Sequence, residues 1–365
     1  MTYKRTRRWL VNLAVAGGSL LLALLLLEIG LRLVNPYGAA IWTRPDDVLG
    51  WSHIPNAPYK SSTEGCPGWG SEGRMNSHGL RDDEYDYAKP ANTFRVLALG
   101  DSYTEGLQHP LEYIWPKLLE QQLNARRDGT HYEVINAGHV GMGTTHEYLY
   151  YTTEGYRYSP DLVIVLVIGN DLEDNSKALS PSYVYSPYYS LVSDQLVLDN
   201  SFNTSPDYRR RVMINSIKQK SFLVSYLHHL YSQIQAPLAP AAAAPADNAE
   251  PAYTSELKEA IAVTQRVFVE LNRATQASGA RLVIFNGSRA YWDKAQPDAL
   301  LTEVARANDV PYFDLMPRLQ DYAARTGEYV FGCAENGGFG HWSRAAHAQG
   351  AALMYEFLRQ SRLLP

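Results

Sequence analysis

Apolar and polar positions divide the chain into three parts. An uncharged apolar run extends from Trp9 to Leu27, and four of the eight residues before it are basic. Residues 36–90 are rich in Pro, Gly, Asn and Asp and show little periodic hydrophobicity, which predicts an irregular extension packed on the following domain. In residues 91–365, short apolar runs alternate with amphipathic stretches, which predicts an α/β domain.

Five apolar runs in residues 91–365 predict the strands of one sheet. Their continuous rather than alternating hydrophobicity is typical of strands that are buried on both faces. Helical stretches separate the runs, so we expect a parallel sheet with helices on both faces. The five runs are FRVLALG (94–100), YEVINAG (132–138), the apolar part of DLVIVLVIGND (161–171), ARLVIFN (280–286) and VPYFDL (310–315).

The alternation is interrupted after Asp171. YYSLVSDQLVLDN (188–200) predicts a small hairpin with a Ser-Asp turn, and residues 208–234 predict one long amphipathic helix. Residues 236–252 are a low-complexity Ala/Pro segment that cannot bury enough apolar surface to order itself, which predicts a flexible linker or loop.

The amino-terminal apolar run has the length of a membrane span. Its 19 residues approach the roughly 20 that cross a bilayer. Because basic flanks stay in the cytoplasm, residues 1–35 predict a cytoplasmic flank and a single-pass anchor through residues 9–34, with the rest of the chain on the outer side. The alternative is a cleaved signal peptide, for which Gly38 and Ala40 offer a weak site.

Charge and cysteine content add two expectations. The net charge of −5 gives no reason to expect nucleic acid as a partner. The only two cysteines, Cys66 and Cys333, lie in glycine-rich segments, and in an exported protein they can form a disulfide, two free thiols being the alternative.

Polar residues gather where the predicted strands end. GDSYTEG follows the first strand, NAGHVGMGT the second and IGND the third, while GHWS precedes the last helix. In open α/β sheets, loops at the carboxyl ends of the strands form the functional crevice. The four clusters therefore predict one site at this edge of the sheet.

These motifs resemble those of the SGNH (GDSL-type) hydrolases. The likeness runs from about Phe94 to the carboxyl terminus, and it implies a three-layer α/β/α, flavodoxin-like fold with a five-stranded parallel sheet and an insertion at about residues 176–255. Ser102 in GDSYTEG stands at the nucleophile position, Gly141 and Asn170 at the second- and third-block positions, and His341 in GHWS at the base.

The residue types fit acyl transfer through a serine. A serine hydroxyl becomes nucleophilic when a neighbouring neutral histidine takes its proton, which predicts Ser102 and His341 as the catalytic pair. The resemblance implies that the backbone N–H groups of Ser102 and Gly141 and the amide of Asn170 stabilise the oxyanion. Asp101 is expected to support the nucleophile turn. The alternative for Ser102 is a helix cap, and for Asn170 a turn residue.

The final block departs from the family pattern. An aspartate usually lies two or three residues before the histidine, where this chain has Phe339 and Gly338. Glu335, six residues upstream, is the possible triad acid, although a plain surface glutamate is the alternative. The histidines near the motifs, His139, His146 and His347, show no ligand spacing, so we expect no metal and no other cofactor.

The amino-terminal segments LLLLEIGLRLV, LGWSHIPN and NSHGLRDDEY are similar to those of membrane-anchored bacterial members of the family. The likeness implies a protein of the bacterial inner membrane with its catalytic domain in the periplasm. The expected substrate is an O-acetyl or short-acyl ester of an envelope or exported polysaccharide, with a lipid ester as the other possibility. The alternatives are an acyltransferase that uses the same site and an inactive SGNH domain that binds polysaccharide.

Overall fold

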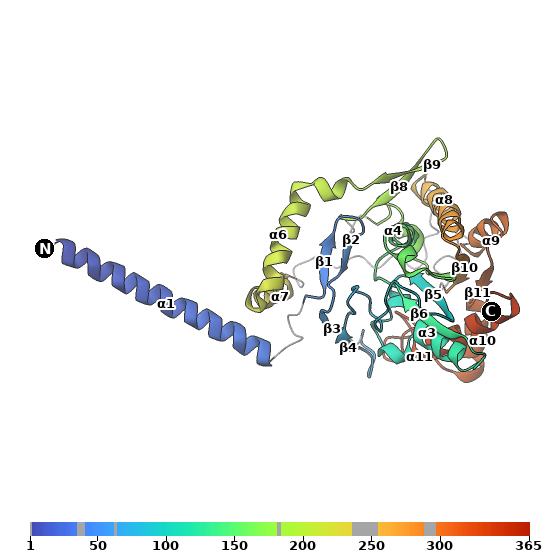
Figure 1. Ribbon diagram of the computed structural model, residues 1–365, viewed down its shortest axis with the longest axis horizontal. Coiled ribbons are helices and arrows are strands. Elements are labelled where there is room, and N and C mark those ends of the chain that lie inside the picture. Colours follow the sequence, from blue (N-terminus) through green and yellow to red (C-terminus); the bar gives the residue numbers. More distant parts are fainter. Residues whose placement is uncertain (1, 35–40, 62–63, 181–183, 236–254, 288–296) are drawn as a thin grey trace.

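The computed structural model describes residues 2–34, 41–61, 64–180, 184–235, 255–287 and 297–365. Helix α1 (Thr2–Val34) extends away from the rest of the molecule (Figure 1). Its stretch Thr6–Val34 is long and apolar enough to cross a membrane, with a mean hydropathy of 2.4 in its most apolar part and none of that part buried. A signal sequence satisfies the same test, and the weak cleavage site at Gly38 and Ala40 lies outside the described residues.

The centre of the fold is a five-stranded parallel sheet, as the sequence predicts. Its strands lie in the order β11-β10-β7-β5-β6. They are β5 (Thr93–Gly100), β6 (His131–Asn136), β7 (Leu162–Val167), β10 (Arg281–Asn286) and β11 (Tyr312–Asp314). All five predicted strands are present, and the three-layer α/β/α fold class is confirmed.

Helices cover both faces of the sheet. Along β5, Leu97 and Leu99 pack on one side with α4, α8 and α9, whereas Val96 and Ala98 pack on the other with α3, α10 and α11. The helices are α3 (Trp115–Asn124), α4 (Thr144–Thr153), α8 (Ser255–Ala277), α9 (Pro297–Ala307), α10 (Met316–Thr326) and α11 (Arg344–Gln360). Because side chains alternate between the faces of a strand and both faces are covered, the strand sequences are apolar throughout.

Short helices occupy the loops, and two of them begin at the carboxyl ends of central strands. Helix α2 (Ser102–Glu105) follows β5, and α5 (Asp171–Asp174) follows β7. The 3-10 helices are η1 (Leu111–Tyr113), η2 (Gly155–Tyr158) and η3 (Ser201–Thr204). The motif residues Ser102 and Asn170 therefore lie at the same edge of the sheet.

The extension contains short strands where the sequence predicts irregular backbone. β1 (Thr43–Asp46) pairs with β2 (Gly50–His53), and β3 (Pro58–Lys60) pairs with β4 (Glu72–Arg74), both antiparallel. Strands of three or four residues are too short to show a period of two in the sequence. The extension packs on the site edge of the sheet, since the buried Arg81 side chain donates to the Glu105 carbonyl at 2.7 Å and Asp82 accepts from the Asn136 N–H at 2.6 Å.

The insertion leads away from the sheet towards α1. The predicted hairpin is present as β8 (Tyr188–Val192) and β9 (Gln195–Asp199), and its turn residues Ser193 and Asp194 both have positive φ, as a type I′ turn requires. The helix predicted over 208–234 is instead two helices, α6 (Pro206–Lys220) and α7 (Phe222–Gln235), because Ser221 between them is extended. The Ala/Pro segment 236–252 lies outside the described residues.

Candidate active site

Ser102 is presented on a tight turn between β5 and α2. At Gly100, φ is +154°, and an added Cβ would lie 2.1 Å from Thr104 Oγ1, so a side chain does not fit there. Asp101 caps α2, because its carboxylate accepts from the Tyr103 N–H at 2.9 Å. Asp101, and not Ser102, is therefore the cap of α2. The Ser102 hydroxyl lies 3.4 Å from Asp101 Oδ2 and has a second, closer partner.

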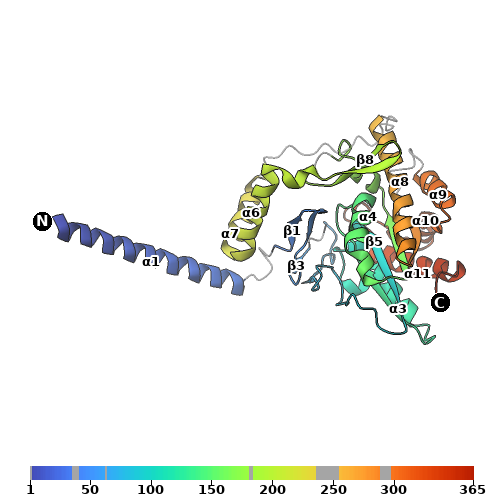
Figure 2. The ribbon, with the colours of Figure 1, turned by 45° about the horizontal axis from the view of Figure 1, so that its top comes forward.

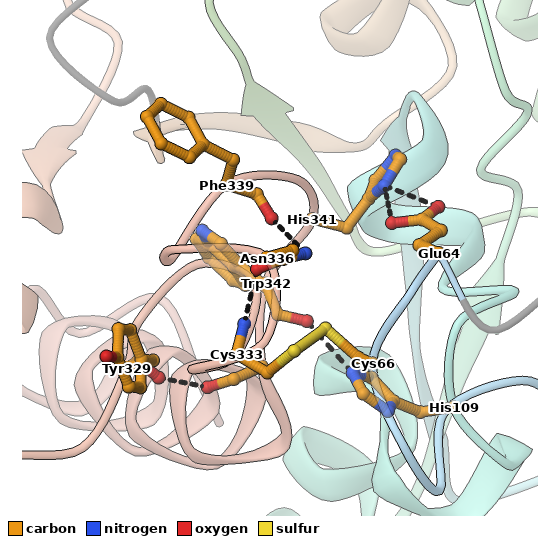
Figure 3. Close-up of a disulfide and its surroundings, with 10 residues drawn as sticks. Glu64, Cys66, His109, Tyr329, Cys333, Asn336, Phe339, His341 and Trp342 are labelled. Carbon is orange, nitrogen blue, oxygen red and sulfur yellow. Dashed lines mark hydrogen bonds and ion pairs between the residues drawn. A yellow bond between two sulfur atoms is a disulfide. The ribbon is translucent and has the colours of Figure 1, made fainter.

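That partner is His341, from the loop before α11. His341 Nε2 lies 2.7 Å from Ser102 Oγ, and its Nδ1 lies 2.9 Å from the Glu64 carboxylate (Figure 3). With Nδ1–H donating to the carboxylate, Nε2 is the acceptor for the Ser102 hydroxyl. Ser102 is 7% exposed, and the side chains of His341 and Glu64 are 23% and 27% exposed. The three groups form a continuous hydrogen-bonded chain at the molecular surface.

Glu64 occupies the place for which the sequence offered Glu335. Glu335 is exposed on its glycine-rich loop, and within the described part of the chain it makes no hydrogen bond or ion pair with His341. Glu64 is 277 residues from His341 and lies in the extension, before the first motif, so no local spacing indicates it. The signal that was available is the cysteine pair, because Cys66 is two residues from Glu64 and Cys333 is eight residues from His341.

The two cysteines form a disulfide that joins these loops. Cys66 and Cys333 are bonded, with their Cα atoms 5.8 Å apart, and Figure 3 shows Glu64 and His341 beside the bridge. Gln108 also holds the Glu64 carboxylate, because its Nε2 donates to Glu64 Oε1 at 2.9 Å. The carboxylate therefore reaches His341 from a segment that is covalently tied to the histidine loop.

The histidine loop is held at its backbone. The Gly332 N–H donates to the His341 carbonyl at 2.8 Å, and the His109 ring lies with Nε2 2.9 Å from the Trp342 carbonyl. Trp342 itself is fully buried in the core, and the Tyr103 hydroxyl donates to the Gly340 carbonyl at 3.0 Å. These contacts fix the direction of the imidazole towards Ser102.

Gly141 and Asn170 lie in the neighbouring loops at the same edge. Gly141 has φ of +68°, and the Val140 N–H donates to Glu105 Oε2 at 2.7 Å, which ties this loop to α2. Asn170 Nδ2 donates to Asp174 at 2.8 Å. Among the residues that the structure describes, the N–H groups of Ser102 and Gly141 donate to no other residue.

Burial controls the charges around the serine. It raises the pKa of Asp101 to about 6, and it raises the pKa values of Glu147 and Asp171 well above the ordinary range. Glu64 behaves differently: burial opposes its ionisation, but the hydrogen bond and the charge of His341 and the Gln108 amide hold its pKa below the usual value. Glu64 is thus ionised at neutral pH, while Glu147 and Asp171 beneath the site add little negative charge.

The prediction that His139, His146 and His347 bind no metal came from their spacing in the sequence alone. In the structure, each of these histidines has another contact. His146 Nε2 lies 2.7 Å from Ser186 Oγ, and His347 Nδ1 accepts from the Trp115 N–H at 3.2 Å. His139 stacks on His53, whose Nε2 lies 3.0 Å from Glu105 Oε1. Within the described ranges, no three His, Cys, Asp or Glu side chains are grouped so as to hold a metal ion.

Comparison with known proteins gives the family. Residues 98–349 match the GDSL-like Lipase/Acylhydrolase family, whereas no curated protein matches the chain. Among solved structures, similar ones are the psychrotrophic esterase EstA from Pseudoalteromonas sp., with 12% identity over 74% of this chain and 99% of that one (TM-score 0.41), and the lipase/acylhydrolase from Enterococcus faecalis, with 12% identity over 73% and 96% (TM-score 0.40). The match over most of the α/β domain shows that this chain belongs to the GDSL-like lipase/acylhydrolase family and is an ester hydrolase of the SGNH type.

Proposed function

We propose that the protein is a membrane-anchored serine esterase in which Ser102 is the nucleophile, His341 the general base and Glu64 the orienting acid. One observation carries this proposal: both ring nitrogens of His341 are engaged, at 2.7 Å by Ser102 and at 2.9 Å by Glu64. If the absence of the usual aspartate meant that the triad was lost, a carboxylate at His341 Nδ1 would not be expected. The arrangement therefore favours an enzyme over a binding domain.

In the proposed reaction, Ser102 Oγ attacks the ester carbonyl carbon while its proton passes to His341 Nε2. The imidazolium that forms is stabilised by the Glu64 carboxylate at Nδ1. When the tetrahedral intermediate collapses, the C–O bond to the leaving alcohol breaks, and that alcohol takes the proton from Nε2. Water, deprotonated by the same nitrogen, then attacks the acyl-serine. The C–O bond to Ser102 breaks, Ser102 Oγ takes the proton back from Nε2, and the acid is released.

The N–H groups of Ser102 and Gly141 and the Asn170 amide are the proposed donors to the oxyanion. Asn170 would turn from its Asp174 contact, or donate its second N–H, when the charge develops. Removal of one such donor generally lowers the rate about 10²- to 10³-fold. Their place at the carboxyl ends of β5, β6 and β7 supports this assignment.

For the substrate, we propose an O-acetyl or other short-acyl ester of an envelope or exported polysaccharide. A single-pass anchor through α1, with its basic end in the cytoplasm, would hold residues 36–365 on the periplasmic side of a bacterial inner membrane. The disulfide supports an exported domain, since such bonds persist in oxidising compartments.

The test is labelling of the full chain in detergent with a fluorophosphonate, together with turnover of p-nitrophenyl acetate. Both should disappear in Ser102→Ala and persist in Ser216→Ala, a matched change on the exposed side of α6. Release of acetate from an acetylated polysaccharide should exceed release of fatty acid from phospholipid. Full turnover by Ser102→Ala would refute the proposed mechanism, and preference for phospholipid would refute the proposed substrate.

A further inference from the structure

The two insertion helices carry exposed apolar side chains opposite the faces on which they are packed. Asn215 of α6 donates to the Thr43 carbonyl of β1, so the opposite face of α6 presents Met213 and Ile217, which are 58% and 49% exposed. In α7, Ser225 is buried, and the opposite face presents Leu227 and Leu230. We call residues 206–235 the α6–α7 elbow. Exposed apolar residues on two adjacent helices can form a contact surface.

The elbow is fixed to the end of the long apolar helix. Glu28 of α1 accepts from the Phe222 and Leu223 N–H groups at 2.7 and 2.8 Å and from the Ser221 hydroxyl at 3.1 Å. Arg32 of α1 lies over the Phe222 ring, 5.9 Å from its centroid. The first turn of α7 is therefore capped by a side chain only six residues before the end of α1.

The elbow also has the orientation of a surface-lying helix pair. Figures 1 and 2 both show α6 and α7 beside the carboxyl-terminal end of α1, with α6 running at a wide angle to α1 and with β1 on its other side. If α1 crosses a bilayer, a helix that crosses the direction of α1 at this end runs along the membrane surface. The face of α6 opposite β1, which carries Met213 and Ile217, then points away from the domain, to the side on which α1 lies.

The charge of the elbow suits a lipid surface. α6 contains five basic residues and one acidic residue, whereas the whole chain has a net charge of −5. Arg209, Arg210 and Lys220 are exposed. α7 contains no Asp, Glu, Lys or Arg in its 14 residues, too few to span a bilayer. Basic side chains are attracted to an anionic membrane surface, and the exposed leucine, isoleucine and methionine side chains beside them can enter its headgroup layer.

We propose that the α6–α7 elbow is a second membrane contact, in which Met213, Ile217, Leu227 and Leu230 enter the outer headgroup layer of the bilayer that α1 spans. This inference rests on the proposed membrane span of α1. With two points of attachment the catalytic domain no longer turns freely about α1, and the site is held at a constant orientation to the membrane. The occupant of the apolar face is lipid.

The test uses the full chain in vesicles of phosphatidylcholine and anionic phosphatidylglycerol. Both native cysteines are in the disulfide, so a single introduced cysteine can be labelled selectively with an environment-sensitive fluorophore. Leu227→Cys and Met213→Cys report on the elbow. Leu21→Cys reports on α1, and Val197→Cys, at an exposed apolar position on β9, is the control.

Probes at Leu227 and Met213 should show blue-shifted emission and strong quenching by lipids that carry a nitroxide near the headgroup. The Leu21 probe should be quenched by a nitroxide deep in the acyl chains, and the Val197 probe by neither. If Leu21 is quenched while Leu227 and Met213 behave like Val197, the elbow proposal is overturned and the anchor stands; this is also the outcome expected if a protein partner covers the elbow. If no probe is quenched, the anchor fails, and the elbow proposal fails with it.

Discussion

Replacement of Glu64 by glutamine should lower kcat/KM for ester hydrolysis about 10- to 200-fold. The Glu64 carboxylate accepts from His341 at 2.9 Å, and a hydrogen bond to a charged group contributes about 1.5–3 kcal/mol. At 1.36 kcal/mol for each factor of ten, its loss in the transition state gives the stated range. The loss stays below the roughly 10⁴-fold of a buried triad aspartate, because the Glu64 side chain is 27% exposed and water can solvate the imidazolium in part.

The assay is turnover of p-nitrophenyl acetate and the rate of fluorophosphonate labelling, for the native chain and for Glu64→Gln. Glu335→Gln is the matched control, since it makes the same chemical change on the loop that the sequence first suggested. Thermal unfolding of both variants verifies the fold. If Glu64→Gln keeps at least half of the native rate, or if Glu335→Gln is equally slow, Glu64 is not the orienting acid.

Two further predictions concern the Cys66–Cys333 disulfide and His109, which contact the loops of the site. Joint replacement of Cys66 and Cys333 by alanine should lower the free energy of unfolding by about 2–4 kcal/mol. In this double variant, Glu64→Gln should lower the activity by a smaller factor than in the native chain, because the disulfide no longer holds the Glu64 loop beside His341. An equal factor in both backgrounds would show that the bridge does not position Glu64. Burial lowers the pKa of His109 to about 4, so the folded state resists protonation and stability is lost as pH falls below 6.5. From pH 7 to pH 5 the native chain should lose up to about 2 kcal/mol more than His109→Gln in urea unfolding, and parallel losses would contradict this.

The sequence predicted the elements whose signal is local. Each strand of the parallel sheet is an unbroken apolar run because both of its faces are covered, and this can be detected within about eight residues. The motif residues Ser102 and Asn170 follow directly after β5 and β7, and His341 lies just before α11, so strand and helix ends alone placed them at one edge of the sheet.

The features that the sequence did not predict depend instead on contacts between segments that are distant along the chain. The break at Ser221 between α6 and α7 has no Gly or Pro to mark it, and it coincides with the hydrogen bonds that Glu28 accepts, 193 to 195 residues away along the chain. The strands β1–β4 are too short for a period to be visible, and they are stabilised by pairing and by packing on the domain.

The sequence by itself determined the fold class and the apolar run that makes a membrane span possible, because composition and period over a few residues specify them. Its motifs, by their resemblance to those of a known family, also gave the nucleophile and base candidates. Only the tertiary structure decided which acid faces His341. Hydrogen-bond geometry acts over about 3 Å and is independent of chain separation. Folding and the Cys66–Cys333 bridge therefore bring Glu64 to the imidazole, while Glu335, much nearer in the chain, stays at the surface.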